Sequence, residues 1–297
     1  MEADAKKDLI YLILFLIGLG LVWYYTGGPN RGTSKSPFVI PPYPIEEAKF
    51  GVFGGGAAGG GSDGEGASSS GTAAEKEQLL SDIISFGSVY KAKETDPSKE
   101  YIEIKLSSKS KNKILFSGLR LKGDYGLDLP IGEGVYLYWP GITNSKEPIF
   151  IEPGGTAIIT SGQSPVGYSF RVNKCTGYFE QFQDFYPSLS KDCPYSKDEN
   201  LPATPNNLDD KCLDYIDNLS RCEAVESMPE YLSSQCQEYL STKINYKACV
   251  DAHRNDSDFY KNEWRIFLDR NEEMWKEKRE TIELLDQSGN LIKLSSY

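Results

Sequence analysis

Cysteine placement is the strongest restriction on how this chain of 297 residues folds. All six cysteines fall in one region beyond the middle of the chain: Cys175, Cys193, Cys212, Cys222, Cys236 and Cys249. An even number in one region is typical of disulfides made in an oxidising compartment. A zinc site needs closer pairs such as C-x-x-C, whereas the shortest spacing here has nine intervening residues. A catalytic thiol would leave one cysteine over. We therefore expect three disulfides and no metal ligands among these residues.

A pairing also follows from the spacing. The last four cysteines are expected on two antiparallel helical segments, where inner residues face inner and outer face outer. The first two would close the aromatic loop that lies between them, and Phe179, Phe182 and Phe185 of that loop should be buried. The expected disulfides are Cys175–Cys193, Cys222–Cys236 and Cys212–Cys249.

An uncharged apolar run at residues 9–25 indicates the compartment. At about 1.5 Å per residue its 17 residues reach about 25 Å, enough for a thin hydrocarbon core. Trp23, Tyr24 and Tyr25 at its end suit a membrane interface, and Lys6 and Lys7 before it favour a cytoplasmic N-terminus. We expect residues 1–25 to be a transmembrane anchor in the cell membrane, with the C-terminal part outside the cytoplasm. A cleaved signal peptide is the alternative, although the run ends in Trp-Tyr-Tyr-Thr-Gly-Gly, which is a poor cleavage site.

Residues 26–73 read as a linker in two styles. The stretch SPFVIPPYPIEE is proline-rich and predicts an extended chain, while FGGGAAGGGSDGEGASSSG predicts flexible coil. Neither stretch can bury enough apolar surface to fold by itself.

Alternating apolar residues predict short strands after this linker. YIEIKL at 101–106 and ILFSGLRL at 114–121 place aliphatic residues on one face, and GVYLYWP at 134–140 alternates in the same way. EPIFIEPGGTAIITSG reads as two strands around a Pro-Gly-Gly turn, and the C-terminal residues 281–297 read as a hairpin. AAEKEQLLSDIIS, just before these strands, has helical spacing. From Asp209 to about Arg254 the spacing is again helical, which predicts two or three helices.

Four of these motifs resemble the successive signatures of the lamin-tail domain family. They are EYIEI at 100–104, LFSGLRL at 115–121, PGGTAII at 153–159 and IELLDQSGNLIKLSSY at 282–297. The resemblance implies an immunoglobulin-like β-sandwich that interacts with partners and catalyses nothing, and in bacteria such domains often sit on surface proteins. It covers residues 74–162 and 262–297, and residues 163–261 read as a cysteine-rich helical insertion. The expected class is thus mainly β.

The sequence gives only weak signals of a catalytic, metal or ligand site. The net charge of −11 argues against nucleic-acid binding, and His253 is the single histidine. Asp256 and Asp258 are candidate calcium ligands, but the segment around them lacks the glycine and the terminal glutamate of a calcium loop. Trp264 and Trp275 could be ligand platforms, although core positions are the commoner role. We expect no catalytic residue, no cofactor and no metal site.

The sequence therefore favours a membrane-anchored extracytoplasmic binding or structural module, with a surface protein or a glycan as its partner. Two alternatives remain open. One is a surface hydrolase with a carboxylate pair at the junction of sandwich and insertion, which a deep pocket with two carboxylates would favour. The other is a pilus-like or secretion-system subunit.

Overall fold

The computed structural model describes residues 15–17, 80–90, 96–124, 126–202, 208–275 and 278–296. The chain divides into two compact units, residues 1–66 and 67–297. In the first unit residues 15–17 are helical and exposed, and the rest of the expected anchor and linker lies outside the described residues. Within the part that is described, no helix is both long and apolar enough to cross a membrane.

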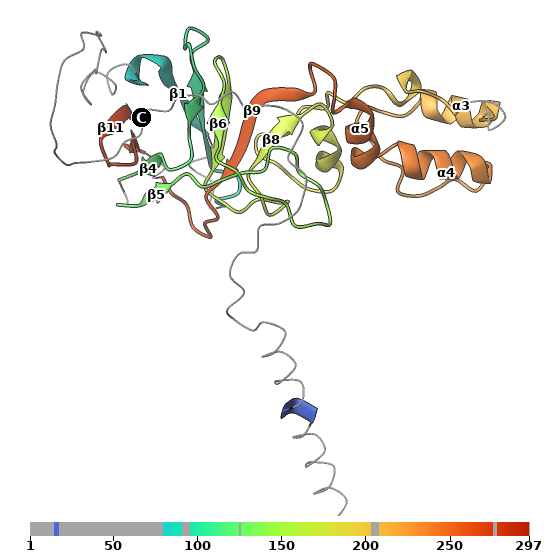
Figure 1. Cartoon of the computed structure of the whole chain (residues 1–297), viewed down its shortest axis with the longest axis horizontal. Helices are drawn as coiled ribbons and strands as arrows, with labels where there is room; N and C mark the ends of the chain where they lie inside the picture. The colour runs from blue at the N-terminus through green and yellow to red at the C-terminus, as the bar shows by residue number, and fades with distance from the viewer. Residues whose placement is uncertain are drawn as a thin grey trace, which may run out of the picture. The chain divides into compact units, whose positions relative to one another are not determined.

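The second unit is mainly β (Figure 1). Its largest sheet has five strands in the order β1-β2-β7-β9-β8. These strands are β1 (Ile84–Tyr90), β2 (Tyr101–Leu106), β7 (Thr156–Thr160), β9 (Tyr260–Phe267) and β8 (Phe170–Asn173). The β1–β2, β2–β7 and β8–β9 pairs are antiparallel, whereas β7 and β9 run parallel, with Ala157 opposite Trp264. A parallel pair needs a long connection, which the cysteine-rich segment supplies.

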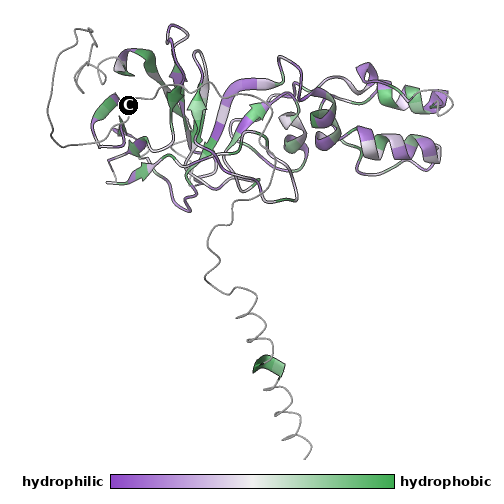
Figure 2. Cartoon of the chain, viewed as in Figure 1, coloured by the Kyte–Doolittle hydropathy of each residue, from purple (hydrophilic) through white to green (hydrophobic). Residues whose placement is uncertain are grey.

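Two smaller sheets complete the β part. A four-stranded sheet has the order β11-β10-β4-β5, and a two-stranded sheet joins β3 to β6. The strands are β3 (Ile114–Leu115), β4 (Arg120–Lys122), β5 (Asp128–Pro130), β6 (Phe150–Ile151), β10 (Thr281–Leu285) and β11 (Leu291–Ser296). Buried residues of all three sheets form one cluster, with Ile104, Ile159, Leu121 and Ile282 among its members. The sheets therefore enclose a common core, and their strands carry many of the hydrophobic residues in Figure 2.

Trp264 and Trp275, the two candidate ligand platforms, both lie in this core. Trp264 is 2% exposed and Trp275 is 1% exposed. The backbone N–H groups of Met274 and Trp275 donate to the carboxylate of Glu100, which also accepts from the Ser161 hydroxyl. Burial raises the pKa of Glu100, against the opposing effect of these hydrogen bonds. Glu100 thus fixes the loop before β10 to the start of β2.

Most expected strands are confirmed, but the single strand expected at 114–121 is divided into β3 and β4 of different sheets, and the strand expected at 134–140 is wrong. Gly134 and Val135 form only isolated bridges, to Glu147 and Phe170. Leu137, Tyr138 and Trp139 pack instead, half-buried, against the cysteine-rich segment. That contact satisfies the alternating pattern without a sheet partner. Of the helix expected in AAEKEQLLSDIIS, residues 80–83 are helical and its last two residues, Ile84 and Ser85, already belong to β1, while its first seven residues lie outside the described part of the chain.

The segment between β8 and β9 forms a lobe of short helices, which we call the disulfide lobe (residues 174–259). Because β8 belongs to the large sheet, the lobe begins later than the expected boundary at residue 163. Its helices are η1 (Thr176–Gln181), η2 (Ser196–Asp198), α3 (Asp210–Asp217), α4 (Ser234–Lys243) and α5 (Tyr246–His253). Three N-caps start the α-helices: Asp209 accepts from Cys212 N–H, Ser233 from Cys236 N–H, and Asn245 from Ala248 N–H.

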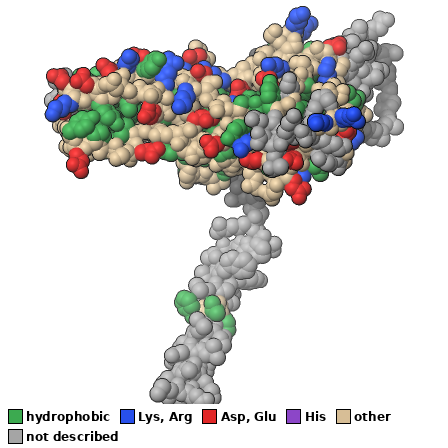
Figure 3. Space-filling model, turned by 180° about the vertical axis from the view of Figure 1, so that it is seen from behind, with side chains coloured by type: hydrophobic (Ala, Val, Ile, Leu, Met, Phe, Trp, Pro, Cys, Tyr) green, Lys and Arg blue, Asp and Glu red, His purple; other side chains and the backbone are tan. Residues whose placement is uncertain are grey.

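Figure 1 shows α3 and α4 side by side at one end of this unit. They share a small core of their own, which includes Ile216, Leu232 and Leu240. Figure 3 shows hydrophobic side chains among charged ones on the surface at this end. Tyr231, which was expected to line a helix, is 64% exposed.

All six cysteines are in disulfides, but the expected pairing is wrong in every pair. The bonds are Cys175–Cys249, Cys193–Cys222 and Cys212–Cys236. The expectation failed because the cysteines do not lie on two long helices. Cys222 follows α3 in a turn, with a positive φ of 57°, and α4 and α5 are separate helices. Cys212 and Cys236 each lie one turn into a capped helix, so neighbouring helices bring these two together.

The aromatic loop between Cys175 and Cys193 is buried in part. Phe179 and Phe185 are 5% and 2% exposed and pack edge-on against Phe170 of β8. Phe182 is 56% exposed, so its expected burial is wrong. It is the C-cap residue of η1, at a point where the chain leaves the helix. The loop therefore attaches the lobe to the sheet through two phenylalanines.

Candidate functional site

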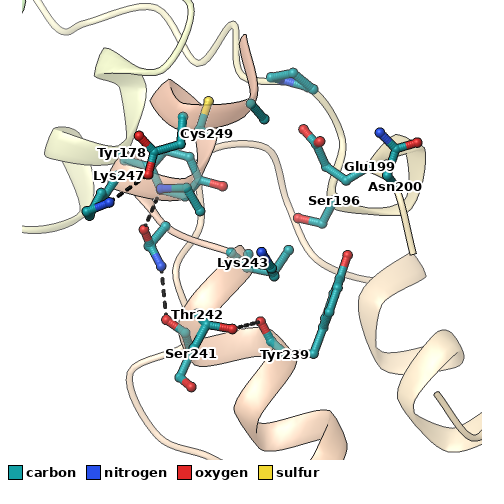
Figure 4. A pocket seen from close by; sticks show the side chains of 16 residues that line it. Tyr178, Ser196, Glu199, Asn200, Tyr239, Ser241, Thr242, Lys243, Lys247 and Cys249 are labelled. Carbon is teal, nitrogen blue, oxygen red and sulfur yellow. Dashed lines mark hydrogen bonds and ion pairs between the residues drawn. The ribbon is translucent and has the colours of Figure 1, made fainter. Parts of the chain in front are cut away.

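A cavity of about 600 Å³ opens within the disulfide lobe (Figure 4). Its walls come from η1, from the segment around η2, from the end of α4 and from α5. Cys175–Cys249 joins the residue before η1 to α5, and Cys249 itself lines the cavity. The chain turns sharply at Ile244 between α4 and α5, so the two helices form adjacent walls. The disulfide framework therefore holds the shape of this cavity.

Three buried residues that carry hydroxyl groups line the cavity. Tyr178, Ser196 and Tyr239 are 5%, 4% and 6% exposed. The hydroxyl of Tyr239 is fully buried and has no hydrogen-bond partner in the described structure. Nor does the side chain of Tyr178 or Ser196 hydrogen-bond another described residue. The labelled side chains come from separate elements and border the same space in Figure 4. Buried polar groups normally have partners, so the unpartnered hydroxyl of Tyr239, in a cavity that two further hydroxyl residues line, points to a polar occupant.

Burial raises the pKa of Tyr178 to about 12, and the negative charge of Glu199 adds to this effect. The pKa of Tyr239 is raised by burial and then by the same carboxylate. Both phenols therefore keep their protons at neutral pH, and each can donate one hydrogen bond and accept others.

Glu199 belongs to a row of charged side chains that leads out of the cavity. Its Oε1 lies 2.8 Å from Nε2 of His253, and Nδ1 of His253 lies 2.8 Å from Asp256. Lys174 then contacts Asp256 at 2.9 Å and Asp258 at 2.6 Å. Burial lowers the pKa of His253, but its hydrogen bonds to the carboxylates of Glu199 and Asp256 outweigh this effect and raise the pKa overall. A protonated His253 would thus compensate the charge of Glu199.

Lysines surround the opening on the side of α4 and α5. Lys247 forms an ion pair with Asp251 at 2.6 Å, one turn along α5. Lys243, at the end of α4, is exposed and lines the cavity. The side chain of Asn245 has a structural role, because it caps α5 and donates to the carbonyl of Ser241. The opening therefore offers an ammonium group, and the lining includes hydroxyls and the carboxylates of Glu199 and Asp251, of which Asp251 is paired with Lys247.

Asp256 and Asp258, the candidate calcium ligands of the sequence, lie outside this cavity. Asp256 and Asp258 both contact Lys174, which supplies a positive charge at that position. Among the residues that the structure describes, no group of three or more His, Cys, Asp or Glu side chains could hold a metal ion. The second unpartnered polar atom of the described chain, Nε1 of Trp275, lies in the core of the sheets.

Sequence reasoning did not single out this site. Tyr178 is one of several aromatics between Cys175 and Cys193, Tyr239 lies in the segment with helical spacing after Asp209, and Ser196 belongs to none of the motifs. One signal was present: a tyrosine on an apolar helix face carries a hydroxyl that needs a partner when buried. The sequence could not show that its partner is missing, because that depends on the fold of residues 194–200 over α4.

Comparison of the chain with protein-family models, with curated proteins and with solved structures finds no match. The interpretation of the cavity therefore depends on its own geometry.

Proposed function

We propose that this protein is a membrane-anchored, extracytoplasmic binding module and that the cavity of the disulfide lobe is its ligand site. The observation that carries the proposal is a cavity of about 600 Å³ lined by Tyr178, Ser196 and Tyr239, in which the buried hydroxyl of Tyr239 has no hydrogen-bond partner among the described residues. A cavity of this size suits a small ligand, and a few convergent polar groups are typical of ligand recognition.

The compartment is supported by the cysteines and by the N-terminal sequence. Three disulfides are compatible with an oxidising environment, such as the outside of a cell. The apolar run at residues 9–25 is our basis for the membrane anchor, and residues 26–73 for its linker to the folded unit.

We further propose that the β part is an immunoglobulin-like sandwich of the lamin-tail type. The motifs that resemble that family lie on core strands: YIEI begins β2, TAII lies in β7, and the C-terminal motif forms the β10–β11 hairpin. Gly118, in the LFSGLRL motif, has a φ of +88°, where a side chain would also meet Gln287. In this view the lobe is an addition that carries the ligand site, and the sandwich is its support.

Binding is favoured over hydrolysis by the state of the carboxylates in the cavity. Glu199 contacts His253, and Asp251 forms an ion pair with Lys247. Glu100, whose pKa is raised, lies in the core of the sheets at 0% exposure. A hydrolase that works through a carboxylate pair needs both carboxylates free to face one substrate bond, and the two described carboxylates in this cavity are each engaged by another side chain.

A bulky side chain at the opening tests the proposal. The full chain, immobilised, is exposed to surface material extracted from the cells that produce it. Thr242, exposed on α4, lines the cavity, so Thr242→Trp should abolish most of the binding by obstructing it. Glu238, exposed on the same helix but outside the cavity, provides the matched control Glu238→Trp, which should bind like the parent. Equal binding by both variants would show that the cavity is not the site.

A further inference from the structure

The geometry points to an uncharged, polyhydroxylated ligand, a glycan unit of one or two sugar rings, as the occupant of this cavity. This inference rests on the proposed function and names the ligand class for the same site. It follows from three properties of the cavity: its hydrogen-bonding groups, its charge and its size.

The hydrogen-bonding groups are mainly hydroxyls. Tyr178, Ser196 and Tyr239 each present a group that both donates and accepts, and the three come from η1, η2 and α4. A sugar hydroxyl also donates and accepts, so each hydrogen bond between the ligand and the cavity can form in either direction. An anion such as phosphate only accepts, and an ammonium group only donates. A ligand with several hydroxyls can use both the donor and the acceptor capacity of all three groups, whereas an anion uses only the donor capacity and an ammonium group only the acceptor capacity.

The charge disfavours an anion. After burial, the negative charge of Glu199 is the second cause that raises the pKa of Tyr178 and of Tyr239. This carboxylate therefore lies close to both hydroxyls. The Glu199 carboxylate does not require a cationic ligand either, because His253 lies 2.8 Å from this carboxylate and supplies the counter-charge when protonated. The ammonium of Lys243 is exposed and lies at the opening. The interior therefore suits a neutral ligand.

Size and support agree with this class. About 600 Å³ is large enough for one or two sugar rings. The cavity walls are held by the Cys175–Cys249 disulfide and by the Asn245 cap of α5, so the hydroxyls are positioned before a ligand arrives. Such preorganisation reduces the cost of binding.

The test uses the full chain in a zwitterionic detergent without a sugar headgroup, because sugar detergents would compete. The uncharged probes are glucose, galactose, mannose, N-acetylglucosamine, maltose, lactose and chitobiose. Glucuronic acid and glucosamine are matched charged probes. Saturation-transfer NMR detects binding, and calorimetry gives the Kd. We expect at least one uncharged sugar to bind, and to bind more tightly than its charged counterpart.

Tyr239→Phe removes only the unpartnered hydroxyl and should raise the Kd about threefold to tenfold, as for one neutral hydrogen bond. Tyr231→Phe, at an exposed tyrosine outside the cavity, should leave the Kd unchanged. The inference is overturned if no uncharged sugar binds, if only charged probes bind, or if the two variants have equal effects. If Thr242→Trp still abolishes capture of surface material in that case, the binding function stands and only the ligand class is wrong.

Discussion

At the scale of single residues, Tyr239 and Tyr246 show what a hydroxyl contributes when it has a partner and when it has none. Both are 6% exposed in the same lobe. Tyr246 donates to the carbonyl of Tyr138 and accepts from Asn173, whereas the hydroxyl of Tyr239 has no partner in the described structure. Burial raises the pKa of both. The first hydroxyl therefore serves the fold, and the second leaves its hydrogen-bonding capacity unused in the described structure.

This contrast predicts opposite effects of one chemical change. Tyr246→Phe should lower the free energy of unfolding by about 1–3 kcal/mol, because it leaves buried polar groups without partners. Tyr239→Phe should leave stability unchanged or raise it slightly. Chemical denaturation of both variants, monitored by tryptophan fluorescence, measures the difference. A loss of stability in Tyr239→Phe as large as in Tyr246→Phe would mean that its hydroxyl has a structural partner.

His253 makes the stability of the lobe depend on pH. Its pKa is raised in the folded state by Glu199 and Asp256, against burial, so its contribution is fully present below the unfolded value of about 6.5. The contribution is lost as the pH rises through the folded pKa. His253→Gln should therefore lower the Tm more at about pH 5.5 than at about pH 8.5. Arg254→Gln, at an exposed neighbour that stays charged, should have the same effect at both values. An equal loss for His253→Gln at the two values would rule out this role.

At the scale of elements, sequence patterns predicted the secondary structure well and the pairings poorly. Alternation identified β2, and helical spacing after Asp209 identified α3 to α5, because both patterns are local. The run at 134–140 has the same alternation, yet it packs on the lobe instead of in a sheet. The disulfide partners depend on where separate short helices meet. A pattern along the chain does not contain that information.

The hairpin of α3 and α4 should be the part of the lobe most dependent on its own disulfide. An isolated helix of eight residues such as α3 is marginal in water, so its stability comes from packing on α4 and from Cys212–Cys236. Replacing both cysteines with alanine should cost about 2–4 kcal/mol and speed amide exchange in both helices. The amides of β2 and β7, which have their own core, should keep their exchange rates and serve as the internal control. Equal acceleration in the strands would show that hairpin and sheets unfold together.

At the scale of the whole molecule, the sequence predicts which side of a membrane the folded unit occupies. Protease added to intact cells should cut within residues 26–73, where glycine-rich sequence predicts an accessible linker, and release a fragment that contains all six cysteines. Mass spectrometry of the released fragment locates the cut. A cytosolic protein of the same cells, uncut until lysis, is the control. If the folded unit is cut only after lysis as well, the proposed topology is wrong.

The place of β9 in the large sheet has a consequence for the order of events during synthesis. β9 lies between β7 and β8, yet it follows them in the chain after the whole disulfide lobe. The β7–β9 contact closes a loop of about a hundred residues, which is a slow, non-local step. A chain that emerges N-terminus first therefore exposes an unfinished sheet edge at β7 until the lobe has emerged in full. Any chaperone that binds the chain before β9 has emerged would meet that open edge, and all six cysteines would be present in the chain before the sheet is complete.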